Sequence, residues 1–187
     1  MRLSKTSAVR IVDFIHQFRR NERNLKRILR YFGCIVIIVA TMARLHINLP
    51  EKFLFSTDIA VRVSDLNYGG HVGNDTMLTL LQEARTQFYK SLGFKDETSF
   101  EGTVGQIIID AAVQYKAESF FGDVLEIQIA AEDFTKFGFD LLYHVKNKTT
   151  GQEIARGKTG IVCFDYSRKK VVSIPAPLLK KLQNISN

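Results

Sequence analysis

The 187-residue chain lacks most of the patterns by which metal, redox and repeat proteins are identified. Its two cysteines, Cys34 and Cys163, are too few for a disulfide framework and belong to no cluster with metal-ligand spacing. It has no internal repeat, and no glycine-rich motif stands between a predicted strand and helix as dinucleotide binding requires. A hydrophobic content of 45% excludes disorder over the whole length. We therefore expect a reduced, cytoplasmic, globular protein without a metal or redox cofactor.

The chain has a net charge of +7, but the excess of positive residues is confined to its first fifty residues. Residues 1–50 contain ten Lys/Arg and two Asp/Glu, a net charge of +8. Residues 51–187 contain sixteen Lys/Arg and seventeen Asp/Glu, a net charge of −1. A nearly neutral domain presents no electrostatic surface for nucleic acid, so we expect no nucleic-acid partner.

The N-terminal extension, residues 1–50, has no hydrophobic run long enough to cross a membrane. Its apolar stretch Tyr31–Ala43 has about thirteen residues, whereas a spanning helix needs about twenty, and too many residues precede it for a signal peptide. Together with the basic stretch Arg19–Arg30 it is compatible with a helix on anionic lipid, so a membrane-surface contact through residues 1–43 stays open. The alternatives are a weak anchor, an extra helix packed on the domain, or translated upstream sequence with Met42 as the native start.

Residues 51–187 are expected to form one domain that begins with a strand, a loop and a long helix. Thr57–Val63 alternates and contains β-branched residues, which predicts a strand. Ser64–Asp75 has the glycines, asparagines and aspartates of a loop. Apolar residues at helical spacing predict a helix over Thr76–Leu92. Residues that favour helix ends flank it, namely Asn74 or Asp75 as the N-cap and Gly93 after the last turn.

After this helix the chain changes to short segments rich in β-branched and aromatic residues. Four of them predict strands: Gln106–Tyr115, Val124–Ala131, Phe137–Val145 and Glu153–Phe164. A last strand over Val171–Ile174 and a short helix over Pro177–Leu182 complete the prediction. Short connections force neighbouring strands to pair antiparallel, and one amphipathic helix on such a sheet is an α+β fold. The open edges of one sheet favour a homo-oligomer.

The segment from Arg62 to Asn74, RVSDLNYGGHVGN, resembles a loop of the 4-hydroxybenzoyl-CoA thioesterase-like branch of the hotdog-fold superfamily. In that branch an arginine, Asp-x-Asp and Gly-His-Val-Asn-Asn lead into a long central helix. Further pieces follow in the order of the family: Gln82–Phe88, Tyr115–Glu118, Phe121–Asp123, Gly157–Gly160 and Ile174–Pro175. The resemblance covers about residues 55–182 and implies an antiparallel sheet wrapped around one long central helix.

The resemblance also implies a function, the hydrolysis of an acyl-CoA or acyl-carrier thioester by a homodimer or homotetramer. Such an enzyme would act in fatty acid metabolism and would need no cofactor beyond the coenzyme A of its substrate. Three rival functions stay open. They are a hydratase or dehydratase on the same fold, a non-catalytic module that binds acyl thioesters or lipids, and a membrane-surface adaptor that uses the basic N-terminus.

Thioester hydrolysis requires a polarised carbonyl and a base, and the loop offers candidates for both. The backbone N–H groups of Gly70, His71 or Val72, just ahead of a helix N-terminus, are the predicted oxyanion donors. In the resembled pattern the second acid of Asp-x-Asp is the base or nucleophile, but this chain has Asn67 there. An amide cannot take a proton at neutral pH. Other hotdog thioesterase branches pair an asparagine in this loop with a carboxylate on the central helix. This resemblance implies that Asn67 orients the thioester or the water and that Glu83, on the helix, acts as the base.

Four further side chains are candidates for supporting roles. Asp65 is the alternative acid and His71 a second acid or base, while Arg156 and Lys158 are candidates for binding coenzyme A phosphates. Each candidate also has a structural interpretation. The loop side chains can simply cap turn amides, the histidine can support the loop, the helix carboxylate can pair with a basic neighbour, and strand cations can face solvent.

Overall fold

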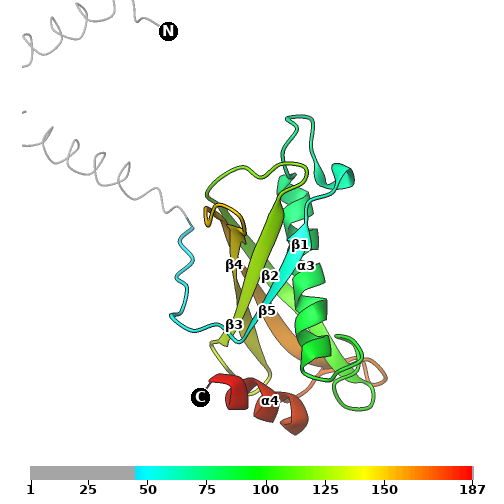
Figure 1. Cartoon of the computed structure of the whole chain (residues 1–187). Coiled ribbons are helices and arrows are strands. Elements are labelled where there is room, and N and C mark those ends of the chain that lie inside the picture. The colour runs from blue at the N-terminus through cyan, green and yellow to red at the C-terminus, as the bar shows by residue number, and fades with distance from the viewer. Residues whose placement is uncertain (1–44, 187) are drawn as a thin grey trace, which may run out of the picture. The chain divides into compact units, whose positions relative to one another are not determined.

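Six strands pair into one antiparallel sheet in the computed structural model, which describes residues 45–186 (Figure 1). They are β1 (Phe55–Ala60), β2 (Val104–Tyr115), β3 (Val124–Glu132), β4 (Gly138–Asn147), β5 (Glu153–Asp165) and β6 (Lys170–Val171). The order across the sheet is β1-β3-β4-β5-β2, and β6 pairs with β5. The helical elements are η1 (Val63–Asp65), α3 (Asn74–Ser91) and α4 (Ala176–Ser186).

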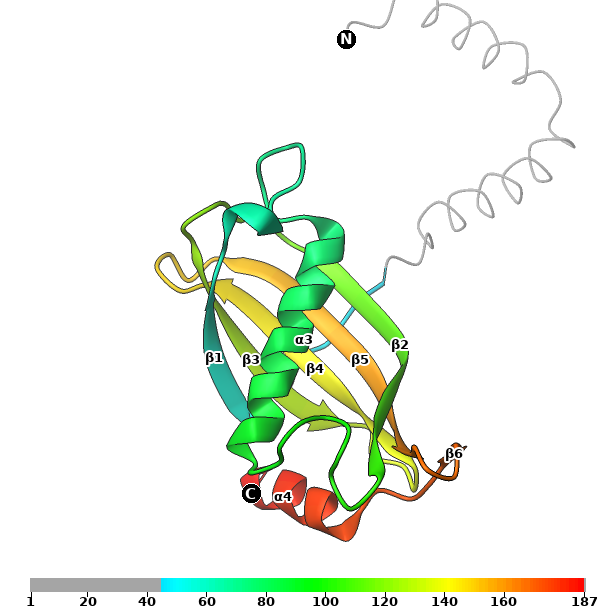
Figure 2. The same ribbon diagram turned by 90° about the vertical axis from the view of Figure 1, so that its right-hand side faces the viewer.

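The sheet curls around α3, which crosses its concave face (Figure 2). The α+β class, the antiparallel sheet and the single long central helix predicted from the sequence are therefore confirmed. No helix within residues 45–186 is long and apolar enough to cross a membrane. The predictions for the basic and apolar stretches of the N-terminal extension lie outside the described residues.

Helix α3 forms because an apolar stripe recurs at helical spacing and faces the sheet. Met77, Leu81, Ala84 and Phe88 are all buried. Complete burial of a side chain the size of Leu81 contributes about 1.5–3 kcal/mol, so this stripe anchors the helix more firmly than helix propensity does. The helix has 18 residues and is therefore about 27 Å long.

The predicted N-cap of α3, Asn74 or Asp75, is wrong by one or two residues, and the predicted start at Thr76 is wrong by two. The helix begins at Asn74, so Gly73 is the N-cap, and no side chain caps this end. Backbone N–H groups of the first turn are consequently left for other acceptors. The predicted C-terminal end is confirmed, since Gly93 follows Leu92 with a φ of 82°.

The two faces of the sheet have different partners. A Cβ on Gly157 would lie 2.5 Å from Cδ1 of Leu81, so Gly157 faces the helix. Side chains alternate along a strand, which places Arg156 and Lys158 on the opposite face. That opposite face is contacted by Ile47, which is buried and whose carbonyl accepts a hydrogen bond from Arg156 (3.1 Å).

Three predicted segment boundaries need correction. β1 ends at Ala60, not Val63, because Asp65 draws the chain into the 3₁₀ turn η1 by accepting a hydrogen bond from the Arg62 N–H (2.8 Å). The last strand is limited to Lys170–Val171, and α4 continues beyond the predicted Leu182 to Ser186.

Candidate active site

A glycine-rich turn between η1 and α3 brings Asn67 and His71 together. The Asn67 N–H donates to the His71 carbonyl (2.9 Å), and the Gly70 N–H donates to the Asn67 carbonyl (3.0 Å). Gly70 has a φ of 77°, which residues with a side chain rarely adopt. A Cβ on Gly69 would lie 2.8 Å from Cε1 of His71. The glycines therefore both close the turn and leave room for the imidazole ring to fold back over it.

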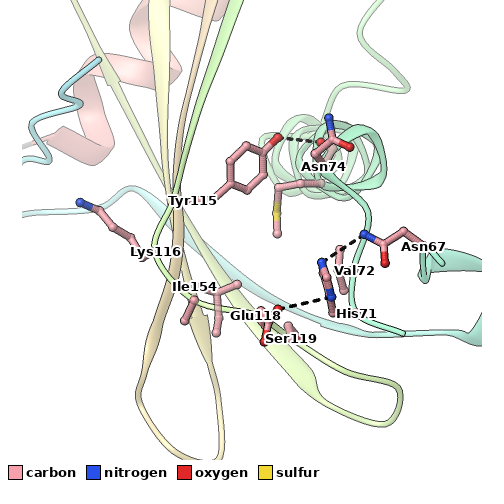
Figure 3. Close-up of a pocket in the computed structure, with 11 residues that line it drawn as sticks. Asn67, His71, Val72, Asn74, Tyr115, Lys116, Glu118, Ser119 and Ile154 are labelled. Carbon is pink, nitrogen blue, oxygen red and sulfur yellow. Dashed lines mark hydrogen bonds and ion pairs between the residues drawn. The ribbon is translucent and has the colours of Figure 1, made fainter. Parts of the chain in front are cut away.

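This turn and the start of α3 line one side of a cavity of about 460 Å³ (Figure 3). Val72, Met77 and Ile154 supply apolar lining. Tyr115, at the end of β2, closes another side and donates its hydroxyl hydrogen to the Asn74 carbonyl (2.7 Å). The volume lies within the range of small-molecule sites, and the lining combines apolar side chains with a few polar groups, as such sites do.

A chain of polar contacts runs along the wall of the cavity. The Gly69 N–H donates to Oδ1 of Asn67 (2.8 Å), and Nδ2 of Asn67 lies 3.1 Å from Nε2 of His71. On the other side of the ring, Nδ1 of His71 lies 3.5 Å from a carboxylate oxygen of Glu118. Figure 3 shows His71 between Asn67 and Glu118. The structure thus brings two of the predicted site residues into one array with a third residue that was not predicted.

Two of the three predicted oxyanion amides are already engaged within the chain. The Gly70 N–H donates to Asn67, and the Val72 N–H donates to the Ser119 carbonyl (2.9 Å). The His71 N–H has no acceptor among the described residues. The first-turn amides of α3 are the other available donors, because a helix provides no acceptor for them. The assignment of an oxyanion site here stays a prediction, in which His71 is the best placed of the three amides.

Glu83 does not line this cavity. It lies with Arg62 and Gln87 in a second cavity of about 420 Å³ between α3 and β1. Its carboxylate accepts a hydrogen bond from the Gln87 side chain (2.8 Å). The predicted cooperation of Asn67 with Glu83 is therefore not formed within one chain, because Asn67, in the turn before α3, and Glu83, in the body of α3, line different cavities.

Asp65 has a structural role in the described domain. Its carboxylate accepts hydrogen bonds from the backbone N–H and the guanidinium of Arg62 (2.8, 3.1 and 3.2 Å). Burial alone would raise the pKa of Asp65. The hydrogen bonds from Arg62 together outweigh this effect, so the pKa of Asp65 lies below its ordinary value. A carboxylate held in this way caps the turn and is poorly suited to the alternative acid role predicted for it.

Arg156 and Lys158 do not line the cavity that contains His71. Arg156 is paired with Glu153 (2.7 Å), and Lys158 is paired with Asp140 (2.8 Å). Both lie on the sheet face opposite α3, as the orientation of Gly157 shows. The binding of coenzyme A phosphates by these two residues stays a prediction, and acids on the same face already pair with both of them.

Neither a metal cluster nor a reactive thiol is found in the part of the chain that the structure describes. No three His, Cys, Asp or Glu side chains in residues 45–186 are grouped so that they could hold a metal ion. Cys163, on β5, is fully buried, and burial raises the pKa of its thiol to about 11. A thiol with this pKa is almost entirely protonated at neutral pH and is a weak nucleophile.

Glu118, Tyr115 and Met77 are among the cavity residues that were not predicted as functional from the sequence. Met77 belongs to the apolar stripe of the helix, which is typical of a core position. Tyr115 and Glu118 lie in the segment Tyr115–Glu118, one of the sequence pieces that resemble the family. This resemblance is the one signal that pointed to them. A single glutamate between a strand and a turn has no pattern of its own, so only its contact with His71 reveals it.

Comparison with known proteins finds similar sequences and similar folds. A curated protein of Aquifex aeolicus (strain VF5) named "Putative esterase" is 27% identical over 115 residues, which are 62% of this chain and 87% of that protein. The crystal structure of Slr0204, a 1,4-dihydroxy-2-naphthoyl-CoA thioesterase from Synechocystis, superposes with a TM-score of 0.65 at 19% identity and covers 71% of this chain and 98% of that one. The structure of BH1999 gentisyl-coenzyme A thioesterase gives a TM-score of 0.61 at 23% identity, with 68% and 99% coverage.

At these identities the solved structures establish the fold alone. The family rests on a separate finding, since residues 61–182 match the model of the thioesterase-like superfamily. That range begins beside Arg62 and includes the glycine-rich turn, α3, the cavity and all strands after β1. The match extends over more than half of the chain and confirms the resemblance first seen in the loop. The chain therefore belongs to the thioesterase-like superfamily.

Proposed function

We propose that this domain hydrolyses an acyl-CoA thioester in the cavity beside the N-terminus of α3. The observation that carries the proposal is the array of Asn67, His71 and Glu118 on the wall of a cavity of about 460 Å³ at that helix end. Membership of the thioesterase-like superfamily supports the reaction class, and the esterase and thioesterase names of similar proteins agree with it.

The chemistry follows from the donors and acceptors that this end of the helix provides. The thioester carbonyl oxygen would accept hydrogen bonds from the His71 N–H and the first-turn amides of α3, where the helix dipole favours developing negative charge. A water that takes the place of the Asn67 NH₂ as the donor to Nε2 of His71 would attack the carbonyl carbon. In this arrangement His71 takes the role of base that the sequence suggested for Glu83, because His71 lines the cavity and Glu83 does not.

The proposal includes a homo-oligomer. Strand β2 is at one end of the strand order, so its outer backbone groups have no strand beside them in the described chain. Ile108 and Ile109 on this strand are 38% and 60% exposed. An exposed edge with apolar side chains is the kind of edge that proteins cover, and a second copy of the chain would cover it. Light scattering of the purified protein would distinguish a monomer, a dimer and a tetramer.

The decisive experiment is a thiol-release screen over aliphatic and aromatic acyl-CoAs and acyl-carrier thioesters. We expect turnover with at least one thioester, and we expect His71→Ala to lower kcat by about 100-fold, the usual minimum for loss of a general base. Glu83→Ala should stay within about threefold of the unchanged enzyme. Glu101→Gln, an exposed carboxylate change outside the cavity, is the matched control. The same screen tests the expected place in fatty acid metabolism.

A hydratase or dehydratase is the second candidate, and one observation favours it. His71 lies next to a carboxylate, Glu118, and that chemistry uses a histidine together with an acid. Incubation with 3-hydroxyacyl-CoA and enoyl-CoA, followed by absorbance of the conjugated product, separates the two reactions because no free thiol appears. Tight binding of acyl-CoA without either product would instead show a non-catalytic module and would contradict the proposal.

A further inference from the structure

The contacts around His71 determine which groups donate and which accept in its hydrogen bonds. Backbone N–H groups only donate, so Oδ1 of Asn67 accepts from Gly69 and the side-chain NH₂ of Asn67 points to His71. An NH₂ group also only donates, so Nε2 of His71 must accept. On the other side of the ring, the carboxylate of Glu118 at 3.5 Å can only accept, which favours the proton on Nδ1.

The position of the negative charge is the unusual feature of this array. Residue 67 is the neutral Asn67 where the resembled loop has an acid, and the carboxylate beside the imidazole is Glu118 instead. Lys116 belongs to the same segment and lines the cavity, but Figure 3 shows its side chain directed away from His71. Within the described cavity, Glu118 is therefore the one charged side chain that contacts the ring.

We propose that Glu118 is a positioning residue that holds His71 in the Nδ1–H tautomer and supplies the negative charge that Asn67 does not. This inference rests on the proposed hydrolysis. It assigns the acid of the site to the segment between β2 and β3, instead of to the loop before α3 or to the body of the helix. The lone pair of Nε2 then accepts from the Asn67 NH₂, and the attacking water would replace this NH₂ as the donor before its proton is transferred.

The resulting step balances without a further reactant. Water donates one proton to Nε2 of His71 while its oxygen lone pair forms the bond to the carbonyl carbon. The imidazolium carries the new charge next to the carboxylate of Glu118. The tetrahedral intermediate then collapses, the C–S bond breaks with its electron pair on sulfur, and the proton on Nε2 passes to that sulfur. The products are the acid, which ionises to solvent, and the free thiol.

The kinetic test compares Glu118→Gln with the unchanged enzyme and with Glu101→Gln as the matched control. Glutamine keeps the size and an acceptor oxygen but has no charge, so the imidazolium loses its stabilisation. We expect kcat to fall about tenfold, the order of effect of a unit charge at 3.5 Å when the carboxylate is 64% exposed and the imidazole 31% exposed. KM should stay within about twofold, because Glu118 acts through His71 and not on the substrate. A kcat within twofold of the unchanged enzyme overturns the proposal.

A second measurement does not depend on activity. The ¹⁵N chemical shifts of the His71 ring, assigned with His71→Gln, report which nitrogen carries a proton at pH 7. We expect the proton of the neutral ring on Nδ1 in the wild-type protein. Asn67→Asp places a carboxylate on each side of the ring, so neither neutral tautomer should be strongly favoured. Asn67→Asp combined with Glu118→Gln should give a neutral Nε2–H ring.

The influence of Glu118 is isolated by the difference between the single variant Asn67→Asp and the double variant. Identical ring spectra for these two proteins would show that Glu118 does not influence His71, and the proposal would be wrong. If the spectra differ as expected but the unchanged protein releases no thiol from any thioester, the proposed function fails while the contact stands. The two failures are therefore distinguishable.

Discussion

Glu97→Ala should destabilise the domain more than Arg85→Met, although each change removes one partner of the same ion pair. The side chain of Arg85, on α3, is only 5% exposed, and its Nε donates to Glu97 (3.0 Å). A second guanidinium nitrogen lies 3.4 Å from the Tyr143 hydroxyl. Glu97 is 24% exposed and also accepts a hydrogen bond from Gln106 (2.8 Å). Removal of Glu97 therefore leaves a buried guanidinium without its ion-pair partner, whereas removal of Arg85 leaves a carboxylate that is partly exposed and still hydrogen-bonded.

The magnitudes follow from this asymmetry. Breaking a fully buried ion pair costs about 3–5 kcal/mol, and the partial exposure of Glu97 reduces the expected cost of Glu97→Ala to about 2–4 kcal/mol. Arg85→Met keeps most of the side-chain volume and leaves a carboxylate that water and Gln106 still reach. We expect this change to cost about 1–2 kcal/mol. The double variant should cost less than the sum, because no buried charge remains unpaired.

Urea unfolding followed by circular dichroism measures the three variants, with m-values checked for constancy. In thermal unfolding, each kcal/mol should appear as about 3–4 °C in Tm for a domain of this size. The reasoning is refuted if Arg85→Met is as destabilising as Glu97→Ala, or if Glu97→Ala costs less than about 1 kcal/mol. Either result would mean that the guanidinium of Arg85 is not desolvated in solution.

Three further predictions concern single residues. In a Cys34→Ser chain, the remaining thiol of Cys163 should not react with a disulfide reagent at pH 8 until the protein is unfolded, because burial raises the pKa of this thiol to about 11. Rapid reaction of one thiol per chain in the folded protein would contradict this. Asp165 has a pKa lowered to about 2, mainly by a serine hydroxyl and a backbone N–H, so its stabilising contribution is present above about pH 4 and lost as the pH falls towards 2. Asp165→Asn should therefore destabilise at pH 7 but have little effect at pH 2, which unfolding curves at both pH values would test. Gly69→Ala should lower kcat about tenfold or more with little loss of Tm, since the new methyl group would displace His71; unchanged kcat would show that this close approach is not required.

The loop and the helix could be predicted from the sequence because their signals are local. Apolar residues at helical spacing located α3, and the clustered glycines located the turn before it. Asn67 and His71 were predicted as site residues from the same short segment, and both line the cavity. The start of the helix and its N-cap were misplaced, since a glycine without a capping side chain carries no signal that distinguishes it from its neighbours.

The partners of individual side chains could not be predicted, because they come from distant parts of the chain. Glu118 reaches His71 through an isolated bridge between the loop and the segment ahead of β3, a contact that no local pattern encodes. Lys158 appeared free to bind phosphate, but pairing of β5 with β4 places it beside Asp140. Glu83 appeared able to reach the loop, but its position on the helix turns it towards β1.

The sequence by itself determined the class of fold, the central helix and the family, because periodicity, turn residues and an ordered set of motifs survive without coordinates. Tertiary structure alone decided which carboxylate meets His71, which amides remain free and which cations are already neutralised. Contacts such as His71 with Glu118 and Lys158 with Asp140 join segments far apart in the chain, and their distances are set by strand register and helix rotation. The chemistry of the site is therefore specified by packing, whereas its location is specified by local sequence.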